Sequence, residues 1–247
     1  MNENYFLSRR SCRKFKPVKI KDEIIKEIIL KATKAPTCGN MQLYSVIVTK
    51  EENRLKKLAE FHYNQPASVT APVILTICAD FNRFTRWCDL NNASHGFNNF
   101  HSFITAMTDA VIFSQQIVTI AEMEGYGTCY LGTVTYNSNE ISEFLQLPDL
   151  VVPVASIALG LIEGEGEETK RLEDSVIHEE IYRRDSDQEI LEIFKIHDLD
   201  PTNEKFIREN KKQNLAQVFS EIRYPKETNE IISSSFSNLL KKKGYLN

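Results

Sequence analysis

The chain has 247 residues, of which 42% are hydrophobic and 26% are charged, and its formal net charge is −4. This composition is ordinary for a globular protein, and the acidic balance offers no general attraction to nucleic acid. The longest mostly apolar stretch, residues 151–162, contains Pro153 and Gly160 and is too short to span a bilayer. We therefore expect neither a nucleic-acid partner nor a membrane partner.

Cysteine and histidine usage gives two further expectations. The five cysteines form no CxxC pair, and an odd count without metal-ligand spacing is typical of reduced thiols. Residues 1–7 are polar and lack the apolar core of a signal peptide. The five histidines show no HxxxH or HExxH spacing, which argues against a metal site. We expect a cytoplasmic protein without a metal.

Residues 22–35 predict the first helix. Asp22 is a candidate cap, and the isoleucines at positions 24, 25, 28 and 29 form one apolar stripe at helical spacing. Pro36 ends the pattern. The further predicted elements are, in chain order, a strand over 43–49, a helix over 51–61, a central strand over 71–79, a loop over 91–101, a helix over 102–123, a short helix over 139–145 and a central strand over 154–161.

The predicted helix 102–123 is apolar or small over most of its surface, and such a helix must be buried. It therefore runs through the middle of the fold or is shared with a second subunit. Residues 186–247 are more polar, with helical patterns over 187–196 and 228–243 and no apolar runs of their own. We expect residues 1–185 to form one domain and 186–247 to be an extension that packs on it or on a partner.

A basic cluster stands near the start of the chain, at Arg9, Arg10, Ser11 and Arg13. A guanidinium group matches a phosphate well, because its planar fork donates two parallel charge-assisted hydrogen bonds. A serine hydroxyl adds a further donor. The alternative interpretation is a solvated charged segment.

Two further segments have the chemistry of a ligand site. Thr37, Cys38 and Gly39 follow Pro36 in a turn whose backbone N–H groups and hydroxyl suit polar ring atoms or phosphate. Tyr130, Leu131, Gly132 and Thr133 follow the long helix, and a glycine there lets the main chain approach a flat ring. Each segment also reads as an ordinary turn that needs no ligand.

Together these segments resemble the FMN-dependent nitroreductase family. The resemblance rests on R-R-S-C-R-K-F at 9–15, A-P-T-C-G-N-M-Q at 35–42 and G-Y-G-T-C-Y-L-G at 125–132. The sequence C-A-D-F-N-R at 78–83 matches the family's larger, NADPH-preferring branch. The fold that this resemblance implies is α+β, with a mostly antiparallel sheet flanked by helices, in an intertwined homodimer with two FMN sites at the interface.

The resemblance also implies the cofactor-binding residues. In the family, the arginine segment contacts the phosphate and ring, the turn at 37–39 reaches the flavin of the partner subunit, and the glycine segment lies at the ring's reactive edge. The residues that align are Arg9, Arg10, Ser11, Arg13, Thr37, Cys38, Gly39, Gln65, Tyr130, Leu131, Gly132, Thr133, Lys170 and Arg171. Two positions depart from the pattern: Thr133 replaces a second glycine, and Lys170 is one step from the family lysine.

The activity implied is that of a flavoprotein oxidoreductase that moves a hydride from NAD(P)H to FMN and on to a nitroaromatic, quinone or flavin by a ping-pong mechanism. The cofactor carries the chemistry, so we expect no separate catalytic residue. Three alternatives stay open: another FMN enzyme of the same fold such as a dehalogenase, a non-catalytic flavin-binding or sensing protein, and an anion-binding module without flavin.

The preferred nucleotide stays open at this point. NADPH carries a 2′-phosphate that needs basic partners, and four candidates lie in the extension: Lys205, Arg208, Lys211 and Lys212. The same four residues also read as the solvated face of a helix.

Overall fold

The computed structural model describes residues 3–164 and 171–246. Its contacts divide the chain into two compact units, one formed by Met1–Glu167 together with Ile232–Asn247 and the other by Glu168–Ile231. The division expected at residue 185 stays a prediction.

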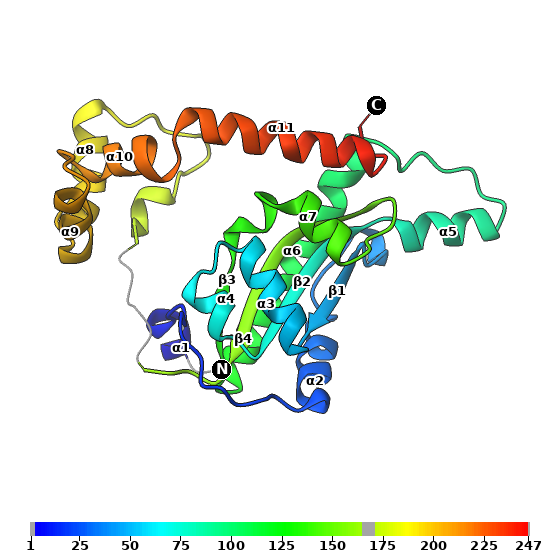
Figure 1. Ribbon diagram of the computed structural model, residues 1–247. Helices are drawn as coiled ribbons and strands as arrows, with labels where there is room; N and C mark the ends of the chain where they lie inside the picture. The colour runs from blue at the N-terminus through cyan, green and yellow to red at the C-terminus, as the bar shows by residue number, and fades with distance from the viewer. Residues whose placement is uncertain (1–2, 165–170, 247) are drawn as a thin grey trace. The chain divides into compact units, whose positions relative to one another are not determined.

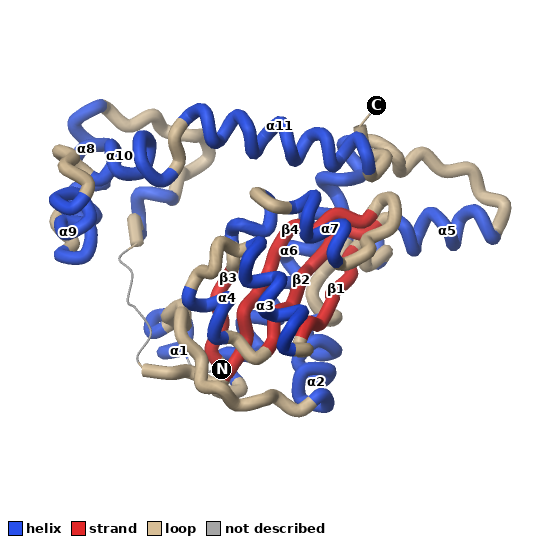
Figure 2. The backbone as a smooth tube through the Cα atoms, in the orientation of Figure 1, coloured by secondary structure: helices blue, strands red, loops and turns tan. Residues whose placement is uncertain are grey.

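The first unit is built on a four-stranded antiparallel sheet (Figures 1 and 2). The strand order is β1 (Tyr44–Thr49), β2 (Val73–Asp80), β4 (Val151–Gly160) and β3 (Gly127–Tyr130), and every neighbouring pair is antiparallel. Helices lie on both faces, so the α+β fold with an antiparallel sheet is confirmed.

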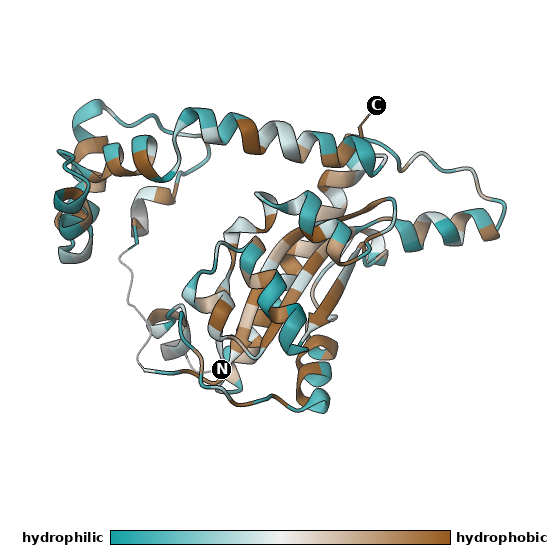
Figure 3. Cartoon of the chain, in the orientation of Figure 1, coloured by the Kyte–Doolittle hydropathy of each residue, from teal (hydrophilic) through white to brown (hydrophobic). Residues whose placement is uncertain are grey.

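Strand β2 is buried along its whole length, as the apolar run predicts. Alternate residues point to opposite faces. Val73, Leu75 and Ile77 join the core under one helical layer, whereas Ile74 joins the core under the other. Figure 3 shows the hydrophobic colouring of these strands. Strand β2 has no polar face that could contact water, and it therefore occupies a central position covered on both sides.

Helix α6 (Phe100–Met123) covers one face of the sheet together with α2 (Asp22–Ala32). Asn99 caps α6 by accepting a hydrogen bond at 3.0 Å from the backbone N–H of Ser102. Among the described residues, α6 is the one helix long and apolar enough to cross a membrane by length and composition, and 44% of its apolar window is buried inside the fold. It packs against the sheet as a core helix.

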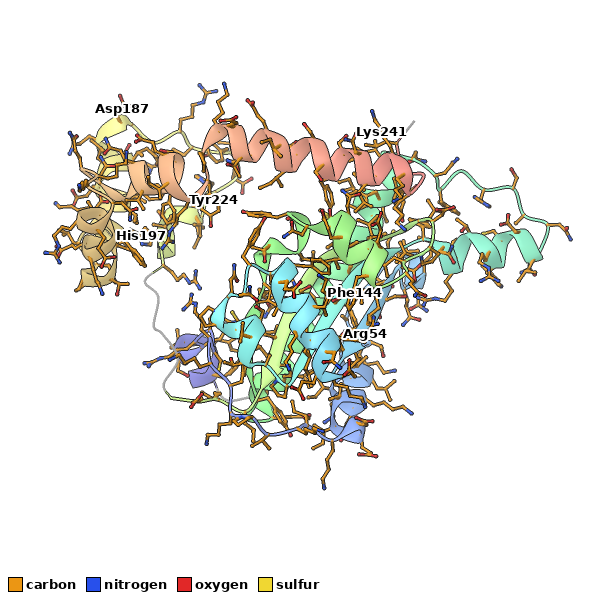
Figure 4. The ribbon with its side chains drawn as sticks, viewed as in Figure 1. Arg54, Phe144, Asp187, His197, Tyr224 and Lys241 are labelled. Atoms are coloured by element: carbon orange, nitrogen blue, oxygen red, sulfur yellow. The ribbon has the colours of Figure 1, made fainter. Side chains whose placement is uncertain are left out.

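The other face carries three shorter helices: α3 (Glu52–Phe61), α4 (Pro66–Thr70) and α7 (Ser138–Phe144). Glu51 caps α3 by accepting from two backbone N–H groups. The guanidinium of Arg54 on α3 lies 4.4 Å from the ring centre of Phe144 on α7 (Figure 4), which ties the two helices together.

Three α-helices and one strand of the first unit were not predicted from the sequence. They are α1 (Glu3–Ser8), α4, α5 (Asn82–Leu90) and strand β3. The predicted helix over 228–243 is found as α11 (Lys226–Lys242), and its later residues return to the first unit. There Tyr245 is fully buried and its hydroxyl donates to the Leu150 carbonyl at 2.8 Å.

Two local details differ from the sequence prediction. Asp22 does not cap α2: Lys21 occupies the cap position without a side-chain bond, and the Asp22 carboxylate pairs with Lys50 instead. Strand β4 begins at Val151 rather than at 154, although it contains Pro153. A bulge opposite β2 at this point accommodates the proline, which has no N–H to donate.

The second unit is helical. It contains α8 (Asp187–Asp198), α9 (Pro201–Glu209), the short α10 (Leu215–Gln217) and a π-helical turn, η4 (Val218–Arg223). Ser186 and Glu189 form a reciprocal capping box that begins α8, which confirms the helix predicted over 187–196. The Arg223 guanidinium lies 4.6 Å from the ring centre of Phe206 and joins η4 to α9.

Candidate functional site

The N-terminal arginine segment, residues 9–13, and the residues that follow it pack over a pair of glycines on the sheet. Gly127 and Gly160 are direct partners on β3 and β4. A Cβ atom on Gly127 would lie 2.7 Å from Cβ of Cys12, and one on Gly160 would lie 2.8 Å from the ring of Phe15. The backbone N–H of Cys12 donates to a carbonyl oxygen of β3 at 2.9 Å. The two glycines therefore fix where the arginine segment leaves the sheet.

Glu122, in the last turn of α6, gathers three donors. Its side chain is only 8% exposed and lies 3.2 Å from Nε of Arg9. It also accepts from the Tyr5 hydroxyl at 2.7 Å and from the Thr128 hydroxyl. Burial, together with Glu122, raises the pKa of Tyr5 to about 12, which keeps this donor neutral. A carboxylate removed from water needs such partners, and Arg9 is oriented by serving as one of them.

The other members of the arginine segment face outward. Arg10 and Arg13 are exposed and Ser11 is half-buried, whereas Cys12 between them is buried. Burial raises the pKa of the Cys12 thiol, so this cysteine is held as a neutral core residue. The segment thus places the exposed side chains of Arg10 and Arg13 and the half-buried Ser11 beside Arg9.

Tyr130 ends β3 next to this segment. Its ring is 38% exposed, and its hydroxyl lies 2.8 Å from Oγ of Ser114 on α6. Burial raises the pKa of Tyr130, while the Ser114 hydrogen bond and the nearby positive charge of Arg9 act in the opposite direction. The following residue, Leu131, is buried in the same apolar cluster as Cys12. The arginine segment and the glycine segment therefore lie side by side.

Gly132 begins the short helix η2 (Gly132–Thr135) and is exposed. Among the described residues, a Cβ atom at Gly132 would meet nothing within 4 Å, and its φ lies outside the left-handed range that favours glycine. Neither packing nor backbone conformation requires a glycine at this position. The main chain at Gly132 is open to the approach of a flat group.

Thr133 and Gln65 are joined through a buried histidine. Oγ1 of Thr133 lies 2.9 Å from Nδ1 of His62, which is fully buried. Burial lowers the pKa of His62 to about 4, so the ring is neutral at physiological pH. Gln65 follows three residues later and precedes α4, where the Thr70 hydroxyl accepts from the backbone N–H of Phe15 at 3.2 Å. Three of the segments predicted from the sequence are thus brought together.

The turn of Thr37, Cys38 and Gly39 is held at another part of α6. The buried carboxylate of Asp109 accepts from the backbone N–H of Cys38 at 2.9 Å. Gly39 has a φ of 55°, a conformation that glycine adopts without strain. The hydroxyl oxygen of Thr37 is buried and has no hydrogen-bond partner within residues 3–164 and 171–246. The structure of the single chain does not join this turn to the other segments.

Lys170 is outside the described residues, and Arg171 is exposed at the start of the second unit.

The residues brought together fit a phosphorylated flavin. The arginine segment supplies cations at a fixed place, as a phosphate dianion requires. The open main chain at Gly132 suits a ring. On the separate turn at 37–39, the Thr37 hydroxyl has no hydrogen-bond partner among the described residues. In the part of the chain that the structure describes, no three His, Cys, Asp or Glu side chains are grouped as metal ligands.

Sequence reasoning missed four residues that hold these segments in place: Asp109, Ser114, Glu122 and His62. The first three are polar residues on the buried side of α6, and each contacts a different predicted segment. That pattern was a usable signal, because a buried polar group requires a partner. His62 had no such signal, since only the tertiary structure places it beside Thr133.

Replacing His62 by glutamine is expected to change how stability depends on pH. The histidine titrates near its ordinary value of 6.5 when unfolded and near 4 when folded. Between these values the unfolded state binds more protons, so the wild type loses stability as pH falls. From about pH 7 to about pH 4.5, the wild type should lose about 2 kcal/mol more than His62→Gln in urea unfolding. The exposed control His101→Gln should follow the wild type; equal losses in all three proteins would contradict the assignment.

Comparisons with known proteins agree with this geometry. The family model described as Nitroreductase family matches residues 7–161. A Cr(VI) reductase from Pseudomonas sp. (strain G-1) is 32% identical over 173 residues, covering 70% of this chain and 71% of that protein. An FMN reductase (NAD(P)H) from Bacillus subtilis (strain 168) is 32% identical over 176 residues, with the same coverages of 70% and 71%.

A solved structure extends the match to nearly the whole chain. The crystal structure of a protein from Bacteroides fragilis superposes with a TM-score of 0.96 at 37% identity, covering 99% of this chain and 100% of that chain. The range matched by the family model includes both the arginine segment and the glycine segment. The chain belongs to the nitroreductase family.

Proposed function

We propose that this protein transfers a hydride from NAD(P)H to FMN and then to a nitroaromatic, quinone or flavin acceptor by a ping-pong mechanism. As a nitroreductase it is an NAD(P)H-dependent oxidoreductase with FMN as its cofactor, and relatives named FMN reductase and Cr(VI) reductase support this assignment. The observation that carries the proposal is the arginine segment, held over the glycine pair beside the open main chain of Gly132.

The arginine segment binds the phosphate in this proposal. Arg10 and Arg13 neutralise its charge and Ser11 donates a hydrogen bond. The ion pair between Arg9 and Glu122 orients the N-terminal end of the segment. Because the path is fixed by β3 and the glycine pair, little conformational entropy is lost when the phosphate binds.

The glycine segment holds the ring. Gly132 leaves room for the flat system to approach the backbone, Tyr130 offers a half-exposed ring, and Gln65 lies on the neighbouring turn. FMN, when bound, supplies the hydride chemistry, and the protein supplies position and electrostatics. The proposed acceptor takes the place that the nicotinamide leaves.

A second copy of the chain completes the proposed site. Helix α6 exposes apolar side chains at Ile104, Val111 and Ile112, and a homodimer gives them a surface to cover. Asp109 lies on the same helix and holds the turn of Thr37, whose buried hydroxyl has no partner within the described chain. We propose that this turn reaches the flavin of the partner subunit.

The donor nucleotide is left to experiment. Lys205 pairs with Glu209 at 3.8 Å and Lys212 pairs with Glu221 at 2.6 Å, whereas Arg208 and Lys211 are exposed. Two of the four candidate partners for a 2′-phosphate are thus already paired with carboxylates in the second unit. This arrangement favours the solvated interpretation for those two lysines.

A visible spectrum of the purified protein tests the proposal directly. We expect flavin absorption bands that bleach when NADPH or NADH is added without oxygen and return when a quinone is added. The nucleotide that reduces the flavin faster is the preferred donor. Parallel lines in double-reciprocal plots of the initial rate, at several acceptor concentrations, support the ping-pong order.

Other outcomes separate the alternatives. A yellow protein that neither nucleotide bleaches would indicate a sensor or a different donor. A colourless protein that added FMN cannot load would exclude the flavin function. Sedimentation of the loaded protein at the mass of one chain would contradict the dimeric site.

Removing the exposed guanidinium groups should weaken the binding of FMN but not of riboflavin, which lacks the phosphate. For Arg10→Ala/Arg13→Ala, we expect FMN affinity to fall by at least about 100-fold, because each charge-assisted hydrogen bond contributes roughly 1.5–3 kcal/mol. Fluorescence titration of the apoprotein with both ligands measures this. The matched control Lys16→Ala removes an exposed cation three residues beyond the segment, and this variant should bind both ligands as the wild type does. Equal losses for FMN and riboflavin would place the phosphate elsewhere.

An added methyl group should affect a different property at each of two glycines: stability at Gly127 and FMN affinity at Gly132. Gly127→Ala places a Cβ against Cys12 and should lower the free energy of unfolding by about 1–3 kcal/mol. Gly132→Ala meets no atom of the described chain, so stability should change by less than about 0.5 kcal/mol while FMN affinity falls at least about tenfold. Urea unfolding and FMN titration give the two readouts. Unchanged FMN binding by Gly132→Ala would contradict the placement of the ring.

A further inference from the structure

A buried histidine–threonine pair joins two segments of the proposed FMN site. His62 ends helix α3 and is fully buried, with Nδ1 2.9 Å from Oγ1 of Thr133. Its other ring nitrogen, Nε2, is buried without a hydrogen-bond partner among the described residues. The ring therefore has a single polar contact, and that contact is to the residue next to Gly132.

The turn that follows His62 needs this support. Tyr63 and Asn64 both have positive φ, 55° and 50°, a conformation that residues other than glycine adopt rarely. The turn leads directly to Gln65, whose backbone N–H donates to the carbonyl of His62 at 3.3 Å. The strained backbone is therefore bounded on one side by the buried histidine and on the other by a predicted flavin contact.

A second hydrogen bond joins the same two segments. Nδ2 of Asn137, just beyond η2, donates to the carbonyl oxygen of Phe61 at 2.6 Å. Within η2 and the residue after it, the backbone N–H groups of Val134 and Tyr136 donate to Leu131 and Thr133. The end of α3 and the η2 turn are thus tied at two points and form one rigid piece.

We propose that His62 and Thr133 form a positioning pair that fixes the η2 turn and the Gln65 turn against the flavin. The inference rests on the proposed FMN site. Where the family pattern has a second glycine, this chain has a threonine, and the histidine supplies the hydrogen-bond partner that the added hydroxyl requires in a buried place. Neither side chain touches the reacting atoms: both act through the backbone of residues 131–133 and through Gln65.

Three single variants and one double variant test the pair. Thr133→Val keeps the shape of the side chain and removes the hydroxyl, Thr133→Ser keeps the hydroxyl, and His62→Leu removes the partner. The double variant combines Thr133→Val with His62→Leu. The control is Thr85→Val, which removes a buried hydroxyl with two hydrogen bonds on α5, away from these segments. FMN affinity is measured by fluorescence titration, and backbone hydrogen exchange of the apoprotein is measured over residues 61–66 and 131–137.

We expect Thr133→Val and His62→Leu each to weaken FMN binding by about tenfold. The double variant should bind FMN about as weakly as either single variant, because both substitutions remove the same hydrogen bond. Exchange should accelerate over both segments in these variants. Thr133→Ser should behave as the wild type, and Thr85→Val should lose stability but keep its FMN affinity and its exchange pattern at both segments.

The opposite results would overturn the inference. It fails if wild type, Thr133→Val and His62→Leu bind FMN equally, or if Thr85→Val weakens FMN binding as much as they do. It also fails if exchange over both segments stays unchanged. If the wild-type protein itself does not bind FMN, the proposed function fails and the flavin role of the pair fails with it.

Discussion

The close packing of the N-terminal segment on two glycines is the constraint on which the site depends. Gly127 and Gly160 face each other across β3 and β4, and Cys12 and Phe15 occupy the space that two Cβ atoms would otherwise fill. This contact turns a short basic segment into a fixed part of the sheet's edge. A guanidinium group on a mobile chain would lose much of its binding energy in becoming ordered, whereas here that cost is met when the protein folds.

Helix α6 positions the remaining segments through three polar residues on its buried side. Asp109 holds the turn at 37–39, Ser114 contacts Tyr130, and Glu122 orients Arg9. Each polar group would be costly in the core without its partner, so the helix also enforces the positions of those partners. The same helix that supports the sheet therefore sets the spacing between separate parts of the site.

The ring side of the site is fixed in a different way. Thr133 and Gln65 lie on connections rather than on regular elements, and connections are usually the mobile parts of a fold. Here they are restrained by the buried His62 and by the hydrogen bond from Asn137 to α3. Gly132 stays open between them because no side chain is needed to hold it. The site thus combines rigid supports with an uncovered backbone, which suits a cofactor that carries the chemistry itself.

The sequence alone predicted the buried strands and the long core helix from apolar periodicity, which is a local property. Its short motifs indicated the family, and that resemblance implied the antiparallel α+β fold. Strand β3 was not predicted, because four residues with two glycines nearby show no strand pattern. The start of β4 was predicted too late, because a proline is unusual inside a central strand and only the structure shows the bulge that accommodates Pro153. Only the tertiary structure decided that Glu122 binds Arg9 and that His62 binds Thr133. Those partners are 113 and 71 residues apart (122 − 9 and 133 − 62), and long-range pairing between buried polar groups depends on the packing of whole elements rather than on local sequence.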